Sequence, residues 1–151
     1  MECTVTWTGA SGAQSPMGFL AETASGHAFM MDGAPDAARP EIGGRNLAPR
    51  PMEVVLAGSG ACSAYDVVLI LKRGRHEVRT CSVKLLAERA ASDPKVFTSI
   101  KMHFTVSGKG LSAAAVERAI AMSRDKYCSA SAMLSKTAEI STSFDLIGAV
   151  A

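Results

Sequence analysis

The chain has 151 residues, 48% of them hydrophobic, which is enough to bury one core and is close to the usual size of a single domain. Lysine and arginine number 16 against 14 acidic residues, no basic block occurs and only 5% of residues are aromatic, so the composition excludes a typical nucleic-acid-binding protein. We expect a single domain over residues 1–151 with no nucleic-acid partner.

Hydropathy and cysteine usage indicate the cellular setting. No stretch reaches the roughly 18 uninterrupted apolar residues of a membrane span, and the first residues do not resemble a signal peptide. We therefore expect a cytoplasmic protein without a membrane partner. In that reducing compartment the four cysteines are expected to be free, redox-active or buried; they are Cys3, Cys62, Cys81 and Cys128. The sequence has no Cys-x-x-Cys motif and no histidine pair at ligand spacing, so we expect no metal site.

Alternating apolar residues predict three short strands, at residues 3–7, 17–21 and 27–31, joined as an antiparallel meander. The segment from Asp32 to Arg50 then carries three prolines and three glycines without periodicity. A loop of this length is uncommon in a compact domain unless it builds a site or a subunit contact. We expect it to have one of these roles.

A long helix is predicted from Pro51, which suits the first helical turn, to about Arg73, before Gly74. The helix is apolar nearly all round as far as Leu71, so we expect a sheet to bury one side and a partner subunit the other. Gly58 and Gly60 would allow another backbone to approach closely.

The second half of the chain predicts a hairpin followed by helices. Apolar residues alternate over residues 81–87 and 96–106 on either side of a Ser-Asp-Pro-Lys turn. Ser112 is suited to cap a helix from Ala113 to about Lys126, a shorter helix over 129–138 follows Cys128, and residues 140–146 read as a closing strand. Because strands and helices are segregated along the chain, the fold class is α+β.

Cys62 and Cys128 occupy the most structured parts of this pattern. On a helix, Cys62 would have Asp66 one turn away, and that anion would raise the pKa of the thiol. Cys128 would lie at a helix N-terminus, where free N–H groups favour an anion, with Arg124 and Lys126 nearby. Each cysteine has an alternative reading as a small buried core residue.

The motifs around the two cysteines resemble a known family. The run Pro-Met-Glu-Val-Val-Leu-Ala-Gly-Ser-Gly-Ala-Cys-Ser-Ala-Tyr-Asp from Pro51 to Asp66 is followed, 66 positions after Cys62, by Cys128 in Tyr-Cys-Ser-Ala-Ser. These motifs and their separation resemble the OsmC/Ohr superfamily, and the first motif most resembles its YhfA-like branch. The similarity extends over essentially the whole chain.

This resemblance implies an OsmC-like fold of antiparallel sheets around a long central cysteine-bearing helix, in an intertwined homodimer with active sites at the subunit interface. It also implies reduction of organic hydroperoxides, with Cys62 attacking the peroxide and Cys128 resolving the sulfenic acid to a disulfide. An external dithiol would then restore both thiols, and no metal or organic cofactor is implied.

Two positions depart from the family pattern. Family peroxidases carry a Glu directly after the motif proline, where this chain has Met52; Glu53 comes one residue later and is turned by about 100° around the helix. They also carry an N-terminal Arg that holds the thiolate, and no Arg precedes Arg39 here. Arg39, Arg45 or Arg50 would have to supply that charge.

Two functions therefore remain open. The first is a dithiol peroxidase acting on apolar organic hydroperoxides in a pocket lined by Met, Leu and Val. The second is a module of the same fold that binds a small apolar ligand or senses oxidation with little turnover, which the missing Glu and Arg favour.

Overall fold

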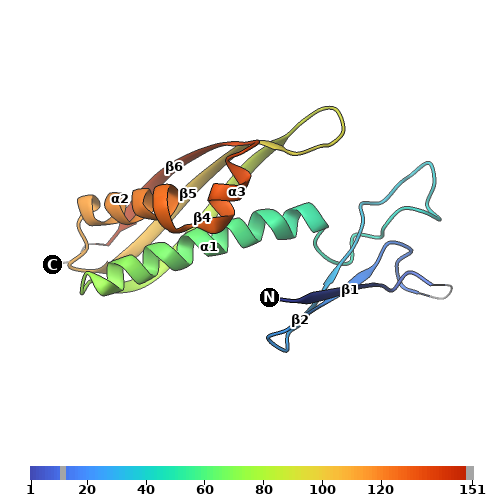
Figure 1. Ribbon diagram of the computed structural model, residues 1–151, viewed down its shortest axis with the longest axis horizontal. Coiled ribbons are helices and arrows are strands. Elements are labelled where there is room, and N and C mark those ends of the chain that lie inside the picture. Colours follow the sequence, from blue (N-terminus) through green and yellow to red (C-terminus); the bar gives the residue numbers. More distant parts are fainter. Residues whose placement is uncertain (11–12, 149–151) are drawn as a thin grey trace. The chain divides into compact units, whose positions relative to one another are not determined.

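The computed structural model describes residues 1–10 and 13–148, and the chain divides into two compact units, residues 1–55 and 56–151. Figure 1 shows the order of the elements along the chain. Each unit contains one three-stranded sheet, and the long helix begins in the first unit and continues into the second.

The first unit contains the predicted antiparallel meander. Strands β1 (Cys3–Trp7), β2 (Phe19–Thr23) and β3 (Ala28–Met31) pair in that order. Ala21 lies opposite both Val5 and Phe29 and is only 1% exposed. The second strand begins at Phe19, two residues later than predicted, because the chain first turns through residues 16–17.

Helix α1 (Pro51–Arg73) has the predicted bounds. At its start the Glu53 carboxylate accepts a hydrogen bond of 2.9 Å from the Arg50 N–H, which is one half of a capping box. At its end the Gly74 N–H donates to the Ile70 carbonyl, and Arg75 takes the left-handed conformation with φ of 62°. The left-handed position after the helix is therefore occupied by an arginine rather than by Gly74.

The second sheet has the order β4-β5-β6, formed by Glu77–Arg89, Phe97–Lys109 and Glu139–Ile147. Strands β4 and β5 form the predicted antiparallel hairpin, but β6 pairs parallel to β5. The expectation of purely antiparallel sheets was therefore wrong for this pair. The helices between β5 and β6 provide the crossover that a parallel connection requires.

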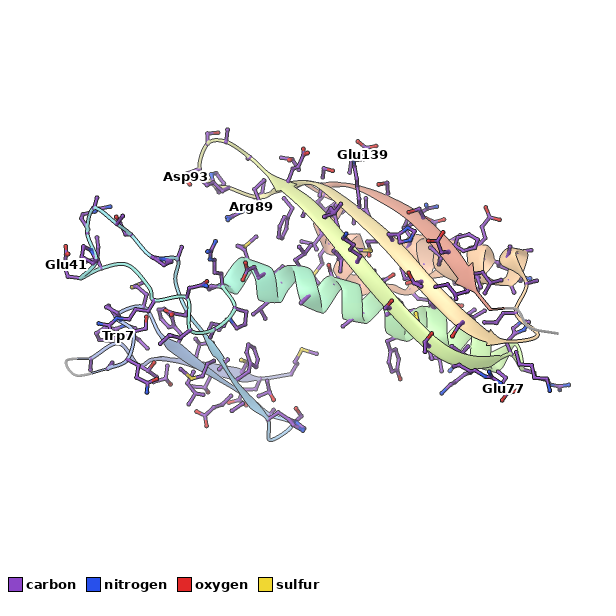
Figure 2. The ribbon with its side chains drawn as sticks, turned by 180° about the vertical axis from the view of Figure 1, so that it is seen from behind. Trp7, Glu41, Glu77, Arg89, Asp93 and Glu139 are labelled. Atoms are coloured by element: carbon purple, nitrogen blue, oxygen red, sulfur yellow. The ribbon has the colours of Figure 1, made fainter. Side chains whose placement is uncertain are left out.

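Helix α1 and the later helices cover the same face of this sheet, as the views from both sides show (Figures 1 and 2). The core between them contains Val67 of α1 together with Ile100 and Phe104 of β5, each fully buried. A Cβ on Gly60 would lie 2.5 Å from the Leu85 side chain. Gly60 therefore leaves room for the Leu85 side chain of β4, so its close neighbour within the chain is a side chain and not the backbone that we expected.

The segment between β5 and β6 contains three helical stretches. Helix α2 (Ala113–Met122) is capped by Ser112, whose side chain accepts a 3.2 Å hydrogen bond from the Ala115 N–H, as predicted. A π-helical turn, Ser123–Tyr127, continues it to within one residue of the predicted end. Helix α3 (Ser129–Leu134) then begins directly after Cys128 and is shorter than predicted, because residues 135–137 form turns.

Helix α1 buries only one stripe of its surface within the chain. Ser59, Ser63, Val67 and Leu71 recur every four residues on the buried side, whereas Tyr65 is 69% exposed. By length and mean hydropathy, 1.9 over 18 residues, α1 is the one helix among the described residues that could cross a membrane, a test that the core helix of a soluble protein also passes.

Candidate functional site

Three side chains with sulfur or oxygen donors meet in the second unit. The Sγ atoms of Cys62 and Cys128 and a carboxylate oxygen of Asp66 all lie within 4.8 Å of one another. Cys62 and Asp66 are one turn apart on α1, and Cys128 comes from the start of α3. The structure therefore brings together the two cysteines that the sequence singled out.

Cys62 is half-buried, and its surroundings disfavour the thiolate. Burial raises the pKa of the Cys62 thiol most, and Cys128 and the negative charge of Asp66 raise it further. A hydrogen bond from the Ala130 N–H lowers this pKa. The net effect is a pKa above the usual value. This agrees with the expectation, drawn from helical spacing, that Asp66 would make Cys62 harder to ionise.

Cys128 is 2% exposed and acts as the N-cap of α3. Its sulfur accepts hydrogen bonds from both the backbone N–H and the hydroxyl of Ser131, at 3.4 and 3.2 Å. The sulfur thus takes the place that an oxygen of Ser, Thr, Asp or Asn usually fills. The predicted position of Cys128 at a helix N-terminus is confirmed, and Ser131 fixes the direction of its side chain.

The Asp66 carboxylate is held by the buried Ser123, which also contacts the buried Ser63. The Ser123 hydroxyl lies 3.2 Å from Oδ2 of Asp66 and 3.0 Å from the hydroxyl of Ser63. Ser63 belongs to α1 and Ser123 to the π-helical turn that precedes Cys128. Single π-helical turns occur frequently at functional sites, and this one places its first residue against the site.

A pocket of about 190 Å³ adjoins the three donors through Asp66. Its other lining residues are mainly apolar or aromatic: Leu69, Ile70, Arg73, Met122 and Tyr127. The lining includes the Met and Leu expected of a hydroperoxide pocket but no Val, and the use of this pocket by a substrate stays a prediction. A small apolar group would therefore fit beside the donors.

The remaining cysteines lie elsewhere. Cys3 is exposed on β1, and Cys81 is half-buried on β4, where burial raises the pKa of its thiol. Glu53 is engaged in capping α1 at Arg50. Arg39 pairs with Asp36 at 3.3 Å on the surface of the first unit.

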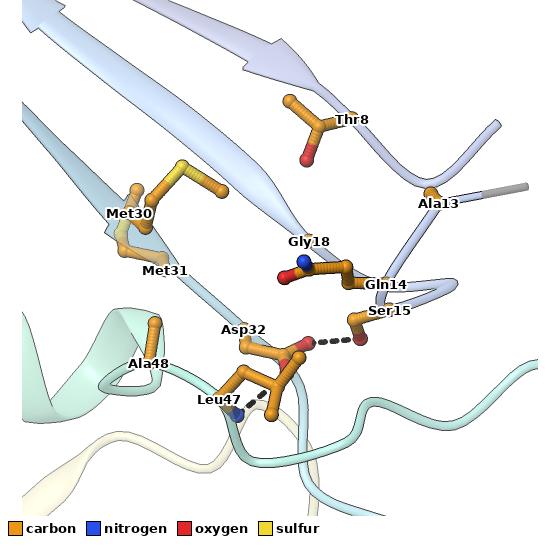
Figure 3. A pocket seen from close by; sticks show the side chains of 10 residues that line it. All are labelled: Thr8, Ala13, Gln14, Ser15, Gly18, Met30, Met31, Asp32, Leu47 and Ala48. Carbon is orange, nitrogen blue, oxygen red and sulfur yellow. Dashed lines mark hydrogen bonds between the residues drawn. The ribbon is translucent and has the colours of Figure 1, made fainter.

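The long loop of the first unit is organised by a second buried carboxylate. Asp32, 2% exposed, accepts hydrogen bonds from Ser15 and from the backbone of Gly33, Arg45 and Leu47. Burial alone would raise the pKa of Asp32, but these hydrogen bonds outweigh it and lower the pKa. Figure 3 shows Asp32 at the wall of a pocket of about 320 Å³ that contains no cysteine or histidine side chain. Asp32, Leu47 and Ala48 of the long loop thus line this pocket, and the expected role of the loop in a site or a subunit contact stays a prediction.

Several of these residues were not identified from the sequence. Asp66 was recognised as a neighbour of Cys62 but not of Cys128, because that contact joins residues 62 positions apart. Ser63 and Asp32 gave no signal, since each is a polar residue in an otherwise ordinary segment. Ser123 was expected only on the apolar face of the helix that begins at Ala113. Ser131 had a usable signal, because it stands three residues after Cys128, the spacing of an N-cap and its N3 residue.

Comparison with known proteins supports the resemblance seen in the motifs. Residues 43–143 match the family model described as OsmC-like protein. Protein YhfA of Escherichia coli (strain K12) is 46% identical over 131 residues, which cover 87% of this chain and 91% of that protein. A hypothetical protein from Aquifex aeolicus VF5 is 26% identical with a TM-score of 0.76, over 96% of this chain and 94% of that one.

More distant structures share the fold. An organic hydroperoxide resistance protein OsmC from Legionella pneumophila has a TM-score of 0.67 at 18% identity, over 96% and 97% of the two chains. A putative organic hydroperoxide resistance protein from Vibrio cholerae, with captopril bound in one of its active sites, has a TM-score of 0.62 at 12% identity, over 95% and 91%. The family match and the 46% identity to YhfA show that this chain belongs to the OsmC-like protein family.

Proposed function

We propose that the protein reduces organic hydroperoxides through a redox cycle of Cys62 and Cys128. The observation that supports this function is the separation of the two sulfurs, at most 4.8 Å in the reduced form. A disulfide has an S–S bond of about 2.05 Å, so the sulfurs need to approach by less than about 3 Å. Hydroperoxide resistance proteins of the same fold make this the natural activity to test.

The proposed cycle has three steps. The Cys62 thiolate attacks one peroxide oxygen, the O–O bond breaks, the alcohol leaves after protonation, and Cys62 becomes a sulfenic acid. The sulfur of Cys128 then attacks the Cys62 sulfur, water leaves and a disulfide forms. An external dithiol reduces that disulfide by exchange, which returns both thiols to their starting state. A reducing cytoplasm is the setting we propose for this last step.

We propose that the apolar part of the substrate occupies the pocket beside Asp66. Leu69, Ile70 and Met122 offer contacts to an alkyl or aryl group, while the peroxide group faces the sulfurs. Related structures hold small molecules in their active sites, as with captopril in the Vibrio cholerae protein.

Activation of Cys62 requires a positive group, because burial, Cys128 and Asp66 raise the pKa of its thiol. We propose that Arg39, Arg45 or Arg50 of the long loop supplies this charge. Changing all three to Ala should raise the pKa of Cys62 further, as followed by thiolate absorbance against pH. An unchanged titration would refute this role.

Consumption of cumene hydroperoxide with dithiothreitol as reductant tests the activity. Cys62→Ser should abolish turnover, whereas Cys128→Ser should allow one oxidation of Cys62 without disulfide formation. Cys81→Ser is the matched control and should retain the wild-type rate, since Cys81 lies outside the site. Mass spectrometry should identify a Cys62 to Cys128 disulfide in the oxidised protein. A Cys62→Ser variant with full activity would contradict the proposal.

A second function is favoured by the raised pKa of Cys62, because a largely protonated thiol reacts slowly with peroxide. Under this alternative the protein binds a small apolar ligand or records oxidation without efficient turnover. Stoichiometric, slow oxidation together with a ligand that raises the melting temperature in a dose-dependent way would favour it.

We further propose that the protein is an intertwined homodimer in which α1 of each subunit packs on its copy. The exposed side of α1 carries Tyr65 and Gly58, and among the described residues an added Cβ at Gly58 would meet no atom within 4 Å outside its own stretch of helix. An exposed apolar face of this kind is typical of a subunit contact.

A further inference from the structure

We propose that the reduced protein binds one Zn²⁺ ion through Cys62, Asp66 and Cys128. The expectation from the sequence was that no metal site exists, because neither the cysteines nor the histidines show ligand spacing. The structure instead assembles three donors from two helices, a set that no single motif contains. This inference does not depend on peroxidase activity.

The distances among the donors suit a tetrahedral ion. With Zn–S bonds of about 2.3 Å and Zn–O bonds of about 2.1 Å, neighbouring ligand atoms in a tetrahedron lie roughly 3.6 to 3.8 Å apart. The three donor atoms here lie within 4.8 Å of one another, so movements of about 1 Å bring them onto one ion. Side-chain rotation alone can provide movements of this size.

The chemistry of the donors selects the metal. Two thiolates and one carboxylate suit Zn²⁺, which accepts sulfur, nitrogen and oxygen ligands. Mg²⁺ and Ca²⁺ prefer oxygen ligands alone and are disfavoured. Three protein ligands leave the fourth position of a tetrahedral ion for water or another small ligand.

Neighbouring hydroxyls hold two of the three donors in place. Ser123 contacts Asp66 at 3.2 Å, and Ser131 contacts the Cys128 sulfur at 3.2 Å. Groups that hydrogen-bond to ligands orient them and commonly contribute to metal affinity. The proposed site therefore has supporting contacts before any metal enters.

Binding of a divalent cation to these donors should depend on pH. Zinc binds cysteine as the thiolate, so it displaces protons from the Cys62 and Cys128 thiols on binding. We therefore expect zinc affinity to increase with pH.

Metal binding and disulfide formation use the same sulfurs and must exclude each other. An organic hydroperoxide would oxidise the two zinc-bound thiolates: with two protons taken up, the products are the disulfide, an alcohol, water and free Zn²⁺. The peroxide accepts the two electrons that the sulfurs lose. Oxidation should thus release the metal, and zinc should protect the thiols from alkylation.

Zinc titration of the reduced full-length protein, in competition with a chromophoric chelator, tests the site. We expect one Zn²⁺ per chain, and a thiolate-to-metal absorption band when Cd²⁺ replaces it. Cys62→Ser, Cys128→Ser and Asp66→Asn should each weaken binding, the cysteine variants by more than about 100-fold, because even partners of ligands contribute about 10- to 100-fold. The double variant Cys3→Ser/Cys81→Ser should bind as the wild type does.

The outcomes separate this inference from the peroxidase proposal. Zinc binding without peroxide turnover in the metal-free protein would support the site and contradict the enzyme. Peroxide turnover without stoichiometric zinc binding would support the enzyme and contradict the zinc site. Binding that survives both Cys62→Ser and Asp66→Asn, or that is lost in the Cys3→Ser/Cys81→Ser protein, would overturn the site. Circular dichroism of each variant shows whether a loss of binding reflects unfolding, and Asp66→Asn keeps the shape of its side chain for that reason.

Discussion

Ser63 and Ser123, both buried, share a hydrogen bond of 3.0 Å between hydroxyls that are 60 residues apart in the sequence. Ser123 also contacts the Asp66 carboxylate at 3.2 Å. This pair joins α1 to the π-helical turn and so connects the segment carrying Cys62 to the segment carrying Cys128. The relative position of the two thiols therefore depends on a polar contact inside the core.

Ser123→Ala should destabilise the protein by about 1–3 kcal/mol, because it removes a hydroxyl and leaves a buried partner without its hydrogen bond. It should also slow formation of the Cys62 to Cys128 disulfide. Chemical denaturation and a timed thiol assay measure the two effects. Ser135→Ala, which removes a hydroxyl bonded to the Ala132 carbonyl at the surface, is the control. Equal effects of the two variants would contradict the role of Ser123.

The reactivity of Cys62 should depend on Asp66. Because the negative charge of Asp66 contributes to the raised pKa of Cys62, Asp66→Asn should lower that pKa. Iodoacetamide labelling of Cys62 near pH 8, read by peptide mass spectrometry, should become faster, since a lower pKa increases the thiolate fraction. Asp145→Asn is the matched control, on the exposed side of β6. Labelling that slows in Asp66→Asn would disprove the assignment.

The raised pKa of Cys62 should make the stability of the folded protein depend on pH. A thiol whose pKa is higher in the folded state than in the unfolded state costs no stability while the pH is below the unfolded pKa, about 8.5. As pH rises above that value, the unfolded chain ionises first and the folded protein loses stability. Cys62→Ser should lack this alkaline component in denaturation measured between pH 7 and pH 10.

Local features of the fold were predictable from the sequence, whereas contacts between distant segments were not. Pro51 and Ser112 mark helix starts by their own conformational preferences, and both predictions are confirmed. Cys128 was also placed correctly at a helix start, from its position between two helical patterns. The parallel pairing of β6 with β5 depends on the path of the intervening helices, which periodicity does not encode. The approach of Asp66 to Cys128 likewise requires the tertiary fold, as does the burial of Asp32. The prediction of a single domain over residues 1–151 stays a prediction.

Asp32 should contribute stability that disappears in acid. Its pKa in the folded state is below the usual value of about 3.9, so the contribution is present above about pH 4 and is lost as pH falls through the folded pKa. Asp32→Asn should lower the free energy of unfolding at pH 7 by about 1.5–3 kcal/mol, as expected for hydrogen bonds to a charged group. Glu22→Gln, an exposed change of the same charge in the same unit, should have little effect. Similar losses in both variants would exclude a specific role for Asp32.

Gly60 should be intolerant of a larger side chain because Leu85 occupies the adjacent space. A Cβ at Gly60 would lie 2.5 Å from Cδ1 of Leu85, so Gly60→Val should cost about 1–3 kcal/mol through overpacking. In a Leu85→Ala background the same change should cost less, because the cavity accepts the added methyl groups. Denaturant midpoints of the four proteins in this cycle give the coupling energy. A coupling energy of zero would show that Gly60 of α1 and Leu85 of β4 are not in steric contact.

Self-association should depend on the exposed side of α1. Tyr65 is 69% exposed in the single chain, and the proposed homodimer would bury it against a second copy. Tyr65→Lys should weaken the dimer by at least about 30-fold in Kd, because loss of a central aromatic contact commonly costs about 2 kcal/mol or more and a charge would then be buried. Leu86→Lys provides the control, since Leu86 is 59% exposed on the opposite face of the β4–β6 sheet. Sedimentation over a range of concentrations should give a dimer for the wild type and Leu86→Lys, and monomers at low concentration for Tyr65→Lys. A wild-type monomer, or a Tyr65→Lys dimer of unchanged affinity, would contradict packing through this face of α1.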